Sequence, residues 1–365
     1  MSVTINGTSG VTFNDASNQT TAATGFGFKN RIINGAMVID QRNAGASVTG
    51  LSQYTLDRWY SGNTQSSKYS VEQTVTGVAA PTGFTDYLAV TSSSAYSVLT
   101  GDTFWIQQPI EGFNIADLAW GTASAATVTL SFWVRSSLTG TFGGAFTNSA
   151  TNRSYPFSYT ISSANTWEQK TVTVAGDTSG TWLTNNGSGI VVRFGLGSGS
   201  TYSGTAGAWA AANYVQPTST VSVVGTNGAT FYITGVQLEK GSTATSFDYR
   251  PYGTELALCQ RYLPAITLTG TNPVCSGYTA SSATAVGIFN FFVTPRTPPT
   301  GITATAASGF SFSSAANFTG SAIAINDASP VAGRFLLTIS GGTASQGGYI
   351  YGSNGAQILW TGCEL

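Results

Sequence analysis

Apolar and polar side chains alternate along TVTLSFWVRSS, residues 127–137, and this alternation is the feature that most constrains the fold. In an extended chain, successive side chains point to opposite faces. One face of this segment therefore carries four apolar side chains: Val128, Leu130, Phe132 and Val134. A two-residue period of this kind is typical of a β-strand. The segment predicts a strand with one buried face.

Further segments with a β-type composition follow one another between glycine-rich turns. They are 103–110, 157–163, 167–176, 189–197, 219–225 and 229–239. Many short strands joined by such turns predict a jelly roll or a related sandwich. The one helical candidate inside this region is IEGFNIADLAWG, residues 110–121, in which Ile115, Leu118 and Ala119 share a helical face.

The spacing of apolar residues changes after the last of these strands. Leu256, Cys259 and Leu263 recur at helical intervals behind Thr254, which has the chemistry of an N-cap. A short helix is therefore expected over 254–263. Strands are expected again over 285–294, 334–340, 346–352 and 356–365, with a rigid turn at PRTPP, 295–299. These later strands predict a second, smaller β-sandwich.

The chain thus divides into four parts of an all-β protein. Residues 1–28 are rich in Ser, Thr, Asn and Gly and predict two short strands, a unit too small to be stable alone. We expect this segment to anchor or oligomerise the chain. Residues 29–253 form the jelly roll, 254–263 the helical connector, and 264–365 a C-terminal β tip domain.

Charge is scarce along the whole chain, at 8% of residues against roughly 25% in ordinary soluble domains. Beyond residue 263 the charged residues are Arg296, Asp327, Arg334 and Glu364. No basic run is present, so nucleic acid is not an expected partner. No apolar stretch approaches the length of a membrane span, so no membrane insertion is expected. An uncharged composition rich in Tyr and Trp is typical of extracellular or virion proteins.

The chain contains no histidine, which excludes Ser-His-Asp and Cys-His catalysis within it. Its 15 acidic residues are scattered singly, so spacing places no carboxylate pair for glycan hydrolysis. The three cysteines lack CxxC spacing and predict buried free thiols, not a disulfide framework or a zinc site. We therefore expect a binding protein without catalytic residues, not an enzyme.

Three segments resemble a pattern that recurs in bacteriophage tail-fibre and related virion structural proteins. They are NRIINGAMVIDQRNAG (30–45), YTLDRWY (54–60) and GVQLEKGSTATSFDYRPYGTELALCQRYL (235–263). In that family, a jelly roll similar to carbohydrate-binding modules lies between the first and the last segment. TWEQKTVTVAGDTSGTW (166–182) resembles a strand and loop of such modules, and GVTFNDASNQTTAA (10–23) resembles the particle-proximal start of trimeric fibres. The resemblance covers residues 1–263 and does not extend into the last domain.

The resemblance implies a phage virion fibre protein that attaches to host cells by recognising a surface glycan. It also implies a homotrimer, joined to other virion proteins through the N-terminal segment and located in the tail. Two alternatives stay open. One is a head fibre or capsid decoration protein with a purely structural role. The other is a glycan-cleaving tailspike, although tailspikes are more often long, repeat-rich β-helices and this sequence shows no such period.

Carbohydrate-binding jelly rolls often hold a structural calcium through an acid in the final strand. Here Thr234 and Gly235 stand where that acid is common. Asp40, Asp57 and Asp248 remain as sources of the several oxygen ligands that calcium needs. A structural calcium is thus an open alternative, and no other cofactor is expected.

Aromatic side chains are the candidates for glycan contact, because they pair an apolar ring face with a polar tip. Trp209 and Tyr214 lie in a loop rich in Gly and Ala, whereas Tyr278, Tyr349 and Tyr351 lie in the tip domain. Tyr349 and Tyr351 are two residues apart and should share a strand face. For each aromatic residue, core packing or a subunit contact is the alternative. Because the far end of a fibre meets the cell first, we expect the main binding site within 264–365.

Overall fold

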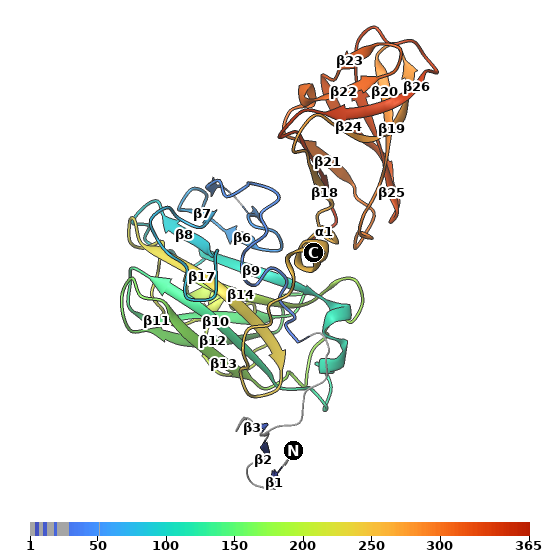
Figure 1. Ribbon diagram of the computed structural model, residues 1–365. Helices are drawn as coiled ribbons and strands as arrows, with labels where there is room; N and C mark the ends of the chain where they lie inside the picture. Colours follow the sequence, from blue (N-terminus) through green and yellow to red (C-terminus); the bar gives the residue numbers. More distant parts are fainter. Residues whose placement is uncertain (1–3, 7–9, 13–17, 20–28, 51) are drawn as a thin grey trace.

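The computed structural model describes residues 4–6, 10–12, 18–19, 29–50 and 52–365, and the described chain is almost entirely β (Figure 1). This confirms the all-β prediction. At the N-terminus, β1 (Thr4–Asn6), β2 (Gly10–Thr12) and β3 (Asn18–Gln19) form a small antiparallel sheet. The sequence predicted two strands here, and the structure has a third. The rest of the predicted anchor segment lies outside the described residues.

Two antiparallel six-stranded sheets form the body. The first has the order β13 (Glu168–Val174), β10 (Val128–Ser136), β17 (Thr230–Lys240), β8 (Leu88–Ser92), β7 (Tyr69–Gln73) and β4 (Val48–Thr49). The second has the order β12 (Ser154–Ile161), β11 (Gly140–Thr147), β14 (Ser188–Ser198), β9 (Thr103–Glu111), β6 (Tyr60–Asn63) and β5 (Gln53–Tyr54). A short parallel pair, β15 (Ser203–Gly204) and β16 (Gln216–Pro217), and the 3₁₀ turn η3 (Ser200–Tyr202) lie beside them.

The core of the body is dominated by aromatic rings between the sheets. Trp59, Phe132 and Phe194 are completely buried, and Phe132 packs against Phe194 with ring centroids 5.1 Å apart. Val128, Leu130 and Val134 are also completely buried, so the predicted inward face of β10 is confirmed. The prediction of an exposed opposite face is wrong, because Thr129 and Ser131 are buried as well. Thr129 donates its hydroxyl to the Gly241 carbonyl at 2.8 Å, since the segment after β17 covers this face.

Two predicted elements differ in the structure. Residues 110–121 form two 3₁₀ turns, η1 (Gly112–Asn114) and η2 (Ala116–Leu118), not an α-helix. Gly112 and Phe113 donate their N–H groups to the loop carbonyls of Gly187 and Asn185, and η2 ends at a left-handed Ala119. Residues 219–225 are not a strand. They cross the ends of β11 and β14, where single N–H groups reach carbonyls of those strands.

The connector helix α1 spans Tyr252–Gln260, so it begins two residues and ends three residues earlier than predicted. Pro251, not Thr254, occupies the N-cap position, and the N–H groups of Thr254 and Glu255 bond to its carbonyl. Proline suits a helix start because its fixed φ matches the helical backbone and its missing N–H is not needed there. None of the described helices is long and apolar enough to cross a lipid bilayer.

The C-terminal domain is a second sandwich, as predicted. Its small sheet has the order β18 (Ala265–Thr267), β27 (Gln357–Thr361) and β21 (Gly301–Ala304). Its large sheet has the order β23 (Asn317–Thr319), β22 (Phe310–Ser313), β26 (Gly347–Gly352), β19 (Asn272–Ser281), β20 (Thr284–Asn290), β25 (Ala332–Thr338) and β24 (Ala322–Ala328), with the 3₁₀ turn η4 (Ala307–Gly309) before β22. Trp360 is completely buried in the core of this domain. We call residues 264–365 the distal domain, because they project from the body beyond α1 (Figure 1).

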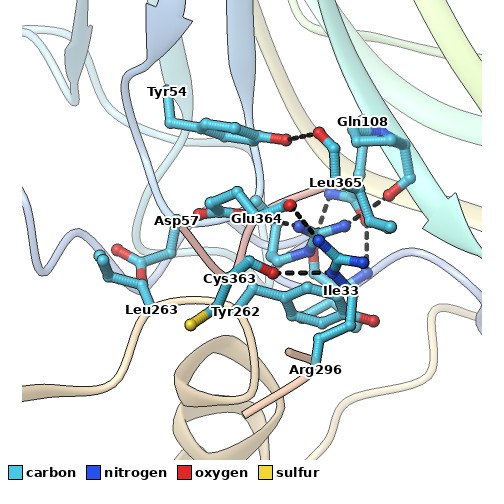
Figure 2. A network of polar contacts seen from close by, with 12 residues as sticks. Ile33, Tyr54, Asp57, Gln108, Tyr262, Leu263, Arg296, Cys363, Glu364 and Leu365 are labelled. Atoms are coloured by element: carbon cyan, nitrogen blue, oxygen red, sulfur yellow. Dashed lines mark hydrogen bonds and ion pairs between the residues drawn. The ribbon is translucent and has the colours of Figure 1, made fainter. Parts of the chain in front are cut away.

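The last residues of the sequence return to the body instead of ending in the distal domain, and the C-terminus lies beside α1 (Figure 1). Glu364 forms ion pairs with Arg42 and Arg58, and the Tyr54 hydroxyl donates to the Leu365 carbonyl at 2.6 Å. Figure 2 shows this network. We call the contact zone between Arg42, Tyr54, Arg58 and residues 363–365 the junction.

The junction is built from the segments that resemble fibre proteins. Arg42 lies in the first segment, Tyr54 and Arg58 lie in the second, and Tyr262 lies at the end of the third. The guanidinium of Arg58 stacks on the Tyr262 ring, 3.6 Å from its centroid. Arg261 forms a 2.6 Å ion pair with Glu111 of β9, and the Tyr262 hydroxyl donates to the same carboxylate. The resemblance segments therefore fix where the distal domain leaves the body.

Candidate functional site

Two tyrosines, one exposed and one half-buried, lie side by side on the outer face of the large distal sheet. Tyr349 and Tyr351 of β26 have ring centroids 6.0 Å apart, and Tyr349 is 45% exposed. Ile350 between them points the other way and is completely buried. The predicted shared face is thus confirmed. A side-by-side pair of rings on an open sheet face offers a platform for a flat, partly apolar ligand.

Tyr278 of β19 extends this platform along the sheet. It stands opposite Gly347 in the β19–β26 ladder, and Ser276 stands opposite Tyr349. Directly paired residues project from the same face, so Tyr278 shares a face with the other two tyrosines. Its side chain is 40% exposed, and a Cβ added at Gly347 would meet no atom within 4 Å. We call Tyr278, Tyr349 and Tyr351 the tyrosine row.

A shallow groove of about 290 Å³ lies at one end of the row. Its lining consists of Thr271, Asn272, Pro273, Ser313, Asn317, Tyr349 and Tyr351. The two asparagines supply amide donors and acceptors, and Thr271 and Ser313 supply hydroxyls. Two of the strands that carry the groove, β22 and β23, lie in the half of the distal domain farther from α1 (Figure 1). The groove therefore combines ring faces with uncharged hydrogen-bonding groups.

The amides and hydroxyls of this groove were not predicted from the sequence. Ser313 stands opposite Tyr349 only because β22 pairs with β26, and Asn317 follows on the adjoining strand β23. Nothing in the local sequence around Ser313 or Asn317 signals this pairing. The only usable signal was the run of small and polar residues in GYIYG and its neighbours, which marks an open strand surface.

One charged pair lies beside the tyrosine row. Arg334 of β25 interacts with the Tyr278 side chain and also forms a 2.6 Å ion pair with Asp327 of β24, so the two charges neutralise each other. The remaining charged residues of the distal domain, Arg296 and Glu364, are engaged at the junction. A ligand at the row would therefore meet rings, amides and hydroxyls, not a net charge.

Trp209 and Tyr214 lie in the body and are not brought together with the tyrosine row. Trp209 is half-buried, packs edge-on against Trp120 with centroids 5.3 Å apart, and donates its indole N–H to the Ala175 carbonyl at 2.9 Å. Tyr214 is half-buried and packs over Gly204, where a Cβ would lie 2.3 Å from the ring. Both rings have packing partners, and less of each is open to a ligand than of Tyr278 or Tyr349.

Two of the acids considered as calcium ligands accept hydrogen bonds from N–H groups, and the third lines a separate pocket. Asp40 accepts from the backbone N–H groups of Asn43 and Gly45, and Asp57 accepts from the backbone and side chain of Gln41. Asp248 lines a pocket that includes neither Asp40 nor Asp57. Within the part of the chain that the structure describes, no three acidic, histidine or cysteine side chains gather to hold a metal.

The three cysteines are free thiols. The prediction that they are buried is confirmed for Cys259 and Cys363 but is wrong for Cys275, which is half-buried. Burial raises the pKa of the Cys363 thiol to about 11. A thiol with so high a pKa is a poor nucleophile near neutral pH. These residues act as small apolar packing groups.

Comparison with known proteins gives weak similarities. No family model and no curated protein matches the chain. Among solved structures, the enzymatically active domain of tailspike protein 4 from bacteriophage CBA120 aligns over 58% of this chain but 21% of its own, at 12% identity and a TM-score of 0.32. A family 11 carbohydrate-binding module from Clostridium thermocellum, solved with a mixed-linked tetrasaccharide, aligns over 55% of this chain and 100% of its own, at 12% identity and a TM-score of 0.27.

A tandem of family 22 carbohydrate-binding domains from Paenibacillus barcinonensis aligns over 87% of this chain and 99% of its own, at 8% identity and a TM-score of 0.26. At such low identities and TM-scores these similarities carry no argument about activity. The jelly roll is established by the strand order and pairing of the chain itself.

Proposed function

We propose that this chain is a fibre protein of a phage virion, located in the tail, that attaches to host cells by binding a surface glycan. The binding site is the tyrosine row of the distal domain, with its groove of amides and hydroxyls. The observation that carries the proposal is the pairing of Tyr349 and Tyr351 at 6.0 Å beside that groove. The protein binds its glycan without cleaving it.

The chemistry of the row suits a sugar. A pyranose has a face of C–H groups that stacks on an aromatic ring and an edge of hydroxyls that donate and accept hydrogen bonds. Tyr349 offers an exposed ring, while Asn272 and Asn317 offer amides at the groove. Exposed aromatic side chains on a soluble sheet face are also costly to leave uncovered, which favours a binding role over a structural one.

The arrangement of the chain suits a fibre. The distal domain is held away from the body by α1 and by the junction, so the row is presented on the projecting part (Figure 1). Residues 1–28 join the chain to other virion proteins and to its own copies, and three copies form the functional unit. Exposed Phe292 and Val331, adjacent through the Phe291–Val331 backbone bond, are apolar groups that contact between copies would cover.

A glycan array tests the proposed site. The full chain should bind a set of host-derived glycans, and the double variant Tyr349→Ala/Tyr351→Ala should lose at least about tenfold in affinity, since stacking of two rings is removed. The double variant Tyr349→Phe/Tyr351→Phe keeps the rings and should retain most of the binding. Phe113→Ala, which removes an exposed aromatic ring of the body outside the groove, serves as the matched control. Full binding by a truncated protein ending at Leu263 would move the site to the body.

Light scattering and particle assembly test the rest of the proposal. The purified chain should have the mass of three copies at micromolar concentration, and a monomer would contradict this. Removal of residues 1–28 should leave the body folded but prevent incorporation into virions. If no glycan binds while the protein still assembles into particles, the purely structural alternative is correct. Release of reducing ends from host polysaccharide would instead identify a tailspike enzyme.

A further inference from the structure

A second pocket lies where the body meets the connector helix, on a different part of the molecule from the tyrosine row. It has a volume of about 270 Å³. Its walls are formed by Asn30, Gly35, Ala36, Val38, Gly83, Phe84, Thr85, Phe247, Asp248, Tyr249, Arg250, Tyr252 and Glu255. Most of these residues come from the first and third resemblance segments, which lie about 200 residues apart in the sequence. This volume is just below the usual range for drug-sized ligands and suits a smaller molecule.

One wall of the pocket is an aromatic platform with a fixed position. Tyr249 packs against Phe247 and Phe84, with centroids 4.8 Å and 5.5 Å away, and its hydroxyl donates to the Gly83 carbonyl at 2.8 Å. The ring is thus held on one side and at its tip, yet the residue is still 58% exposed. Tyr252 of α1, at 63% exposure, stands at the same pocket. A ring that is already held in place loses little freedom when a ligand stacks on it.

The polar wall of the pocket offers a carboxylate with spare hydrogen-bonding capacity. The carboxylate of Asp248 accepts one long bond, 3.4 Å from the Asn30 N–H, although a carboxylate can accept about four. Glu255, by contrast, is bound to Arg250 and to the Asn34 N–H. Hydrogen bonds to an ionised carboxylate are roughly twice as strong as neutral ones. Asp248 is therefore the group that would fix the orientation of a ligand.

The charged residues at and beside the pocket sum to zero, which favours a neutral ligand over a cationic one. Of the lining residues, Asp248 and Glu255 are negative and Arg250 is positive. Lys29, which precedes the lining residue Asn30 and donates to the Ser246 carbonyl, adds a second cation beside the pocket. An aromatic wall with an uncompensated acid would favour an alkylammonium group. With two acids and two cations, the site favours a neutral molecule that has an apolar face and several hydroxyls.

We propose that this pocket binds a single neutral pyranose ring, with its C–H face on Tyr249 and adjacent hydroxyls on the carboxylate of Asp248. Tyr252 adds a second exposed ring from α1, so the ligand contacts the body and the connector together. The site is separate from the tyrosine row and does not depend on the function proposed for that row. Each chain would then have a second glycan contact. The pocket would hold the terminal sugar of a glycan, whereas the tyrosine row would contact the glycan along its length.

Ligand-observed NMR with methyl glycosides tests the proposal. The protein is the full chain carrying Tyr349→Ala/Tyr351→Ala, so that the tyrosine row does not contribute to the binding measured. The probes are the methyl glycosides of glucose, galactose, mannose and N-acetylglucosamine, with choline as the cationic alternative. At least one glycoside should bind saturably in the millimolar range. Tyr249→Ala and Asp248→Asn should each weaken that binding roughly tenfold, from loss of ring stacking and of charge-assisted bonds respectively.

Two control variants separate these effects from misfolding and from net charge. Tyr249→Phe keeps the ring and removes its anchor, so binding should fall by no more than about threefold. Glu72→Gln changes the net charge by the same amount as Asp248→Asn, but Glu72 lies on β7 outside the pocket, and binding should be unchanged. All variants should unfold in the same temperature range as the parent.

Three results would overturn the proposal: no glycoside binds, or binding survives Tyr249→Ala and Asp248→Asn at full strength, or choline binds in preference to every glycoside. None of these results bears on the tyrosine row, whose function is tested separately on the glycan array.

Discussion

Arg58 and Glu364 are 306 residues apart in the sequence and form a 2.6 Å ion pair at the junction. The Arg58 side chain is 1% exposed, and its second guanidinium nitrogen donates to the Pro109 carbonyl. The same Glu364 carboxylate binds Arg42 at 2.8 Å. One residue near the end of the chain thus satisfies two cations of the body.

Glu364→Ala should loosen the distal domain and lower the free energy of unfolding by about 3 kcal/mol, because removing one partner leaves a buried cation without its anion. Chemical denaturation measures the loss, and small-angle X-ray scattering should show a wider range of angles between the body and the distal domain. Asp327→Asn, which breaks the exposed pair with Arg334, is the matched control and should have no measurable effect. Equal stability of the two variants would show that the junction does not hold the domain.

Stability should be greatest near about pH 4 because two buried acids have pKa values shifted in opposite directions. Burial raises the pKa of Asp57 from 3.8 to about 7, against the bonds from Gln41 that lower it, so the stabilisation from its protonated form is complete below pH 3.8 and is lost as pH rises from there through 7. Burial alone would raise the pKa of Glu111, but the bonds from Arg261 and Tyr262 lower it below 4.5, so its stabilisation is lost as pH falls further.

Urea denaturation from about pH 3 to pH 8 measures this profile. Asp57→Asn should remove the decline between about pH 4 and pH 7 while leaving the acid limb in place. If the variant keeps the same decline over this interval as the parent, Asp57 is not the group that titrates there.

Gly35→Ala should destabilise the body by about 2 kcal/mol through overpacking. A Cβ at Gly35 would lie 2.2 Å from the Val236 carbonyl oxygen, where the Val236 N–H also bonds back to the Gly35 carbonyl. Gly101→Ala is the control, because a Cβ there meets no atom within 4 Å. Thermal unfolding of both variants checks the difference, and equal midpoints would mean that the first segment moves freely away from β17.

Glycan binding at the tyrosine row should depend little on salt. The charges near the row, Arg334 and Asp327, are paired with each other, so a ligand gains no long-range attraction that ions would screen. Affinity should change by less than about twofold between low and high salt. A tenfold loss in high salt, measured by titration calorimetry, would show that an ionic contact carries the binding.

Local sequence patterns were sufficient for the element types that depend on local periodicity. The alternation around Phe132 predicted β10, and the change of spacing after Arg250 predicted α1. The errors arose where contacts with distant segments of the chain determine the type of element. Residues 110–121 follow a helical pattern, but the loop carbonyls of Asn185 and Gly187 capture the N–H groups that an α-helix would leave free at its start. The helix start moved because the Pro251 carbonyl, not the Thr254 side chain, meets the first N–H groups.

The candidate sites likewise combine features that local spacing predicts with features that depend on long-range strand pairing. The shared face of Tyr349 and Tyr351 follows from a spacing of two and was predictable. The amide of Asn317 and the hydroxyl of Ser313 come from other strands, and the register that brings them to Tyr349 is set by long-range pairing. The pocket at Tyr249 was missed for the same reason, since its walls come from segments at both ends of the body.

The return of residues 363–365 to the body gives the distal domain two attachments, where a chain that simply ran on to a tip would have one. A single peptide link acts as a swivel, about which the domain can rotate. A second attachment at Glu364, in addition to the covalent one at Leu263–Pro264, opposes that rotation and shares any pulling force. A domain tethered in this way transmits torque as well as tension to the body.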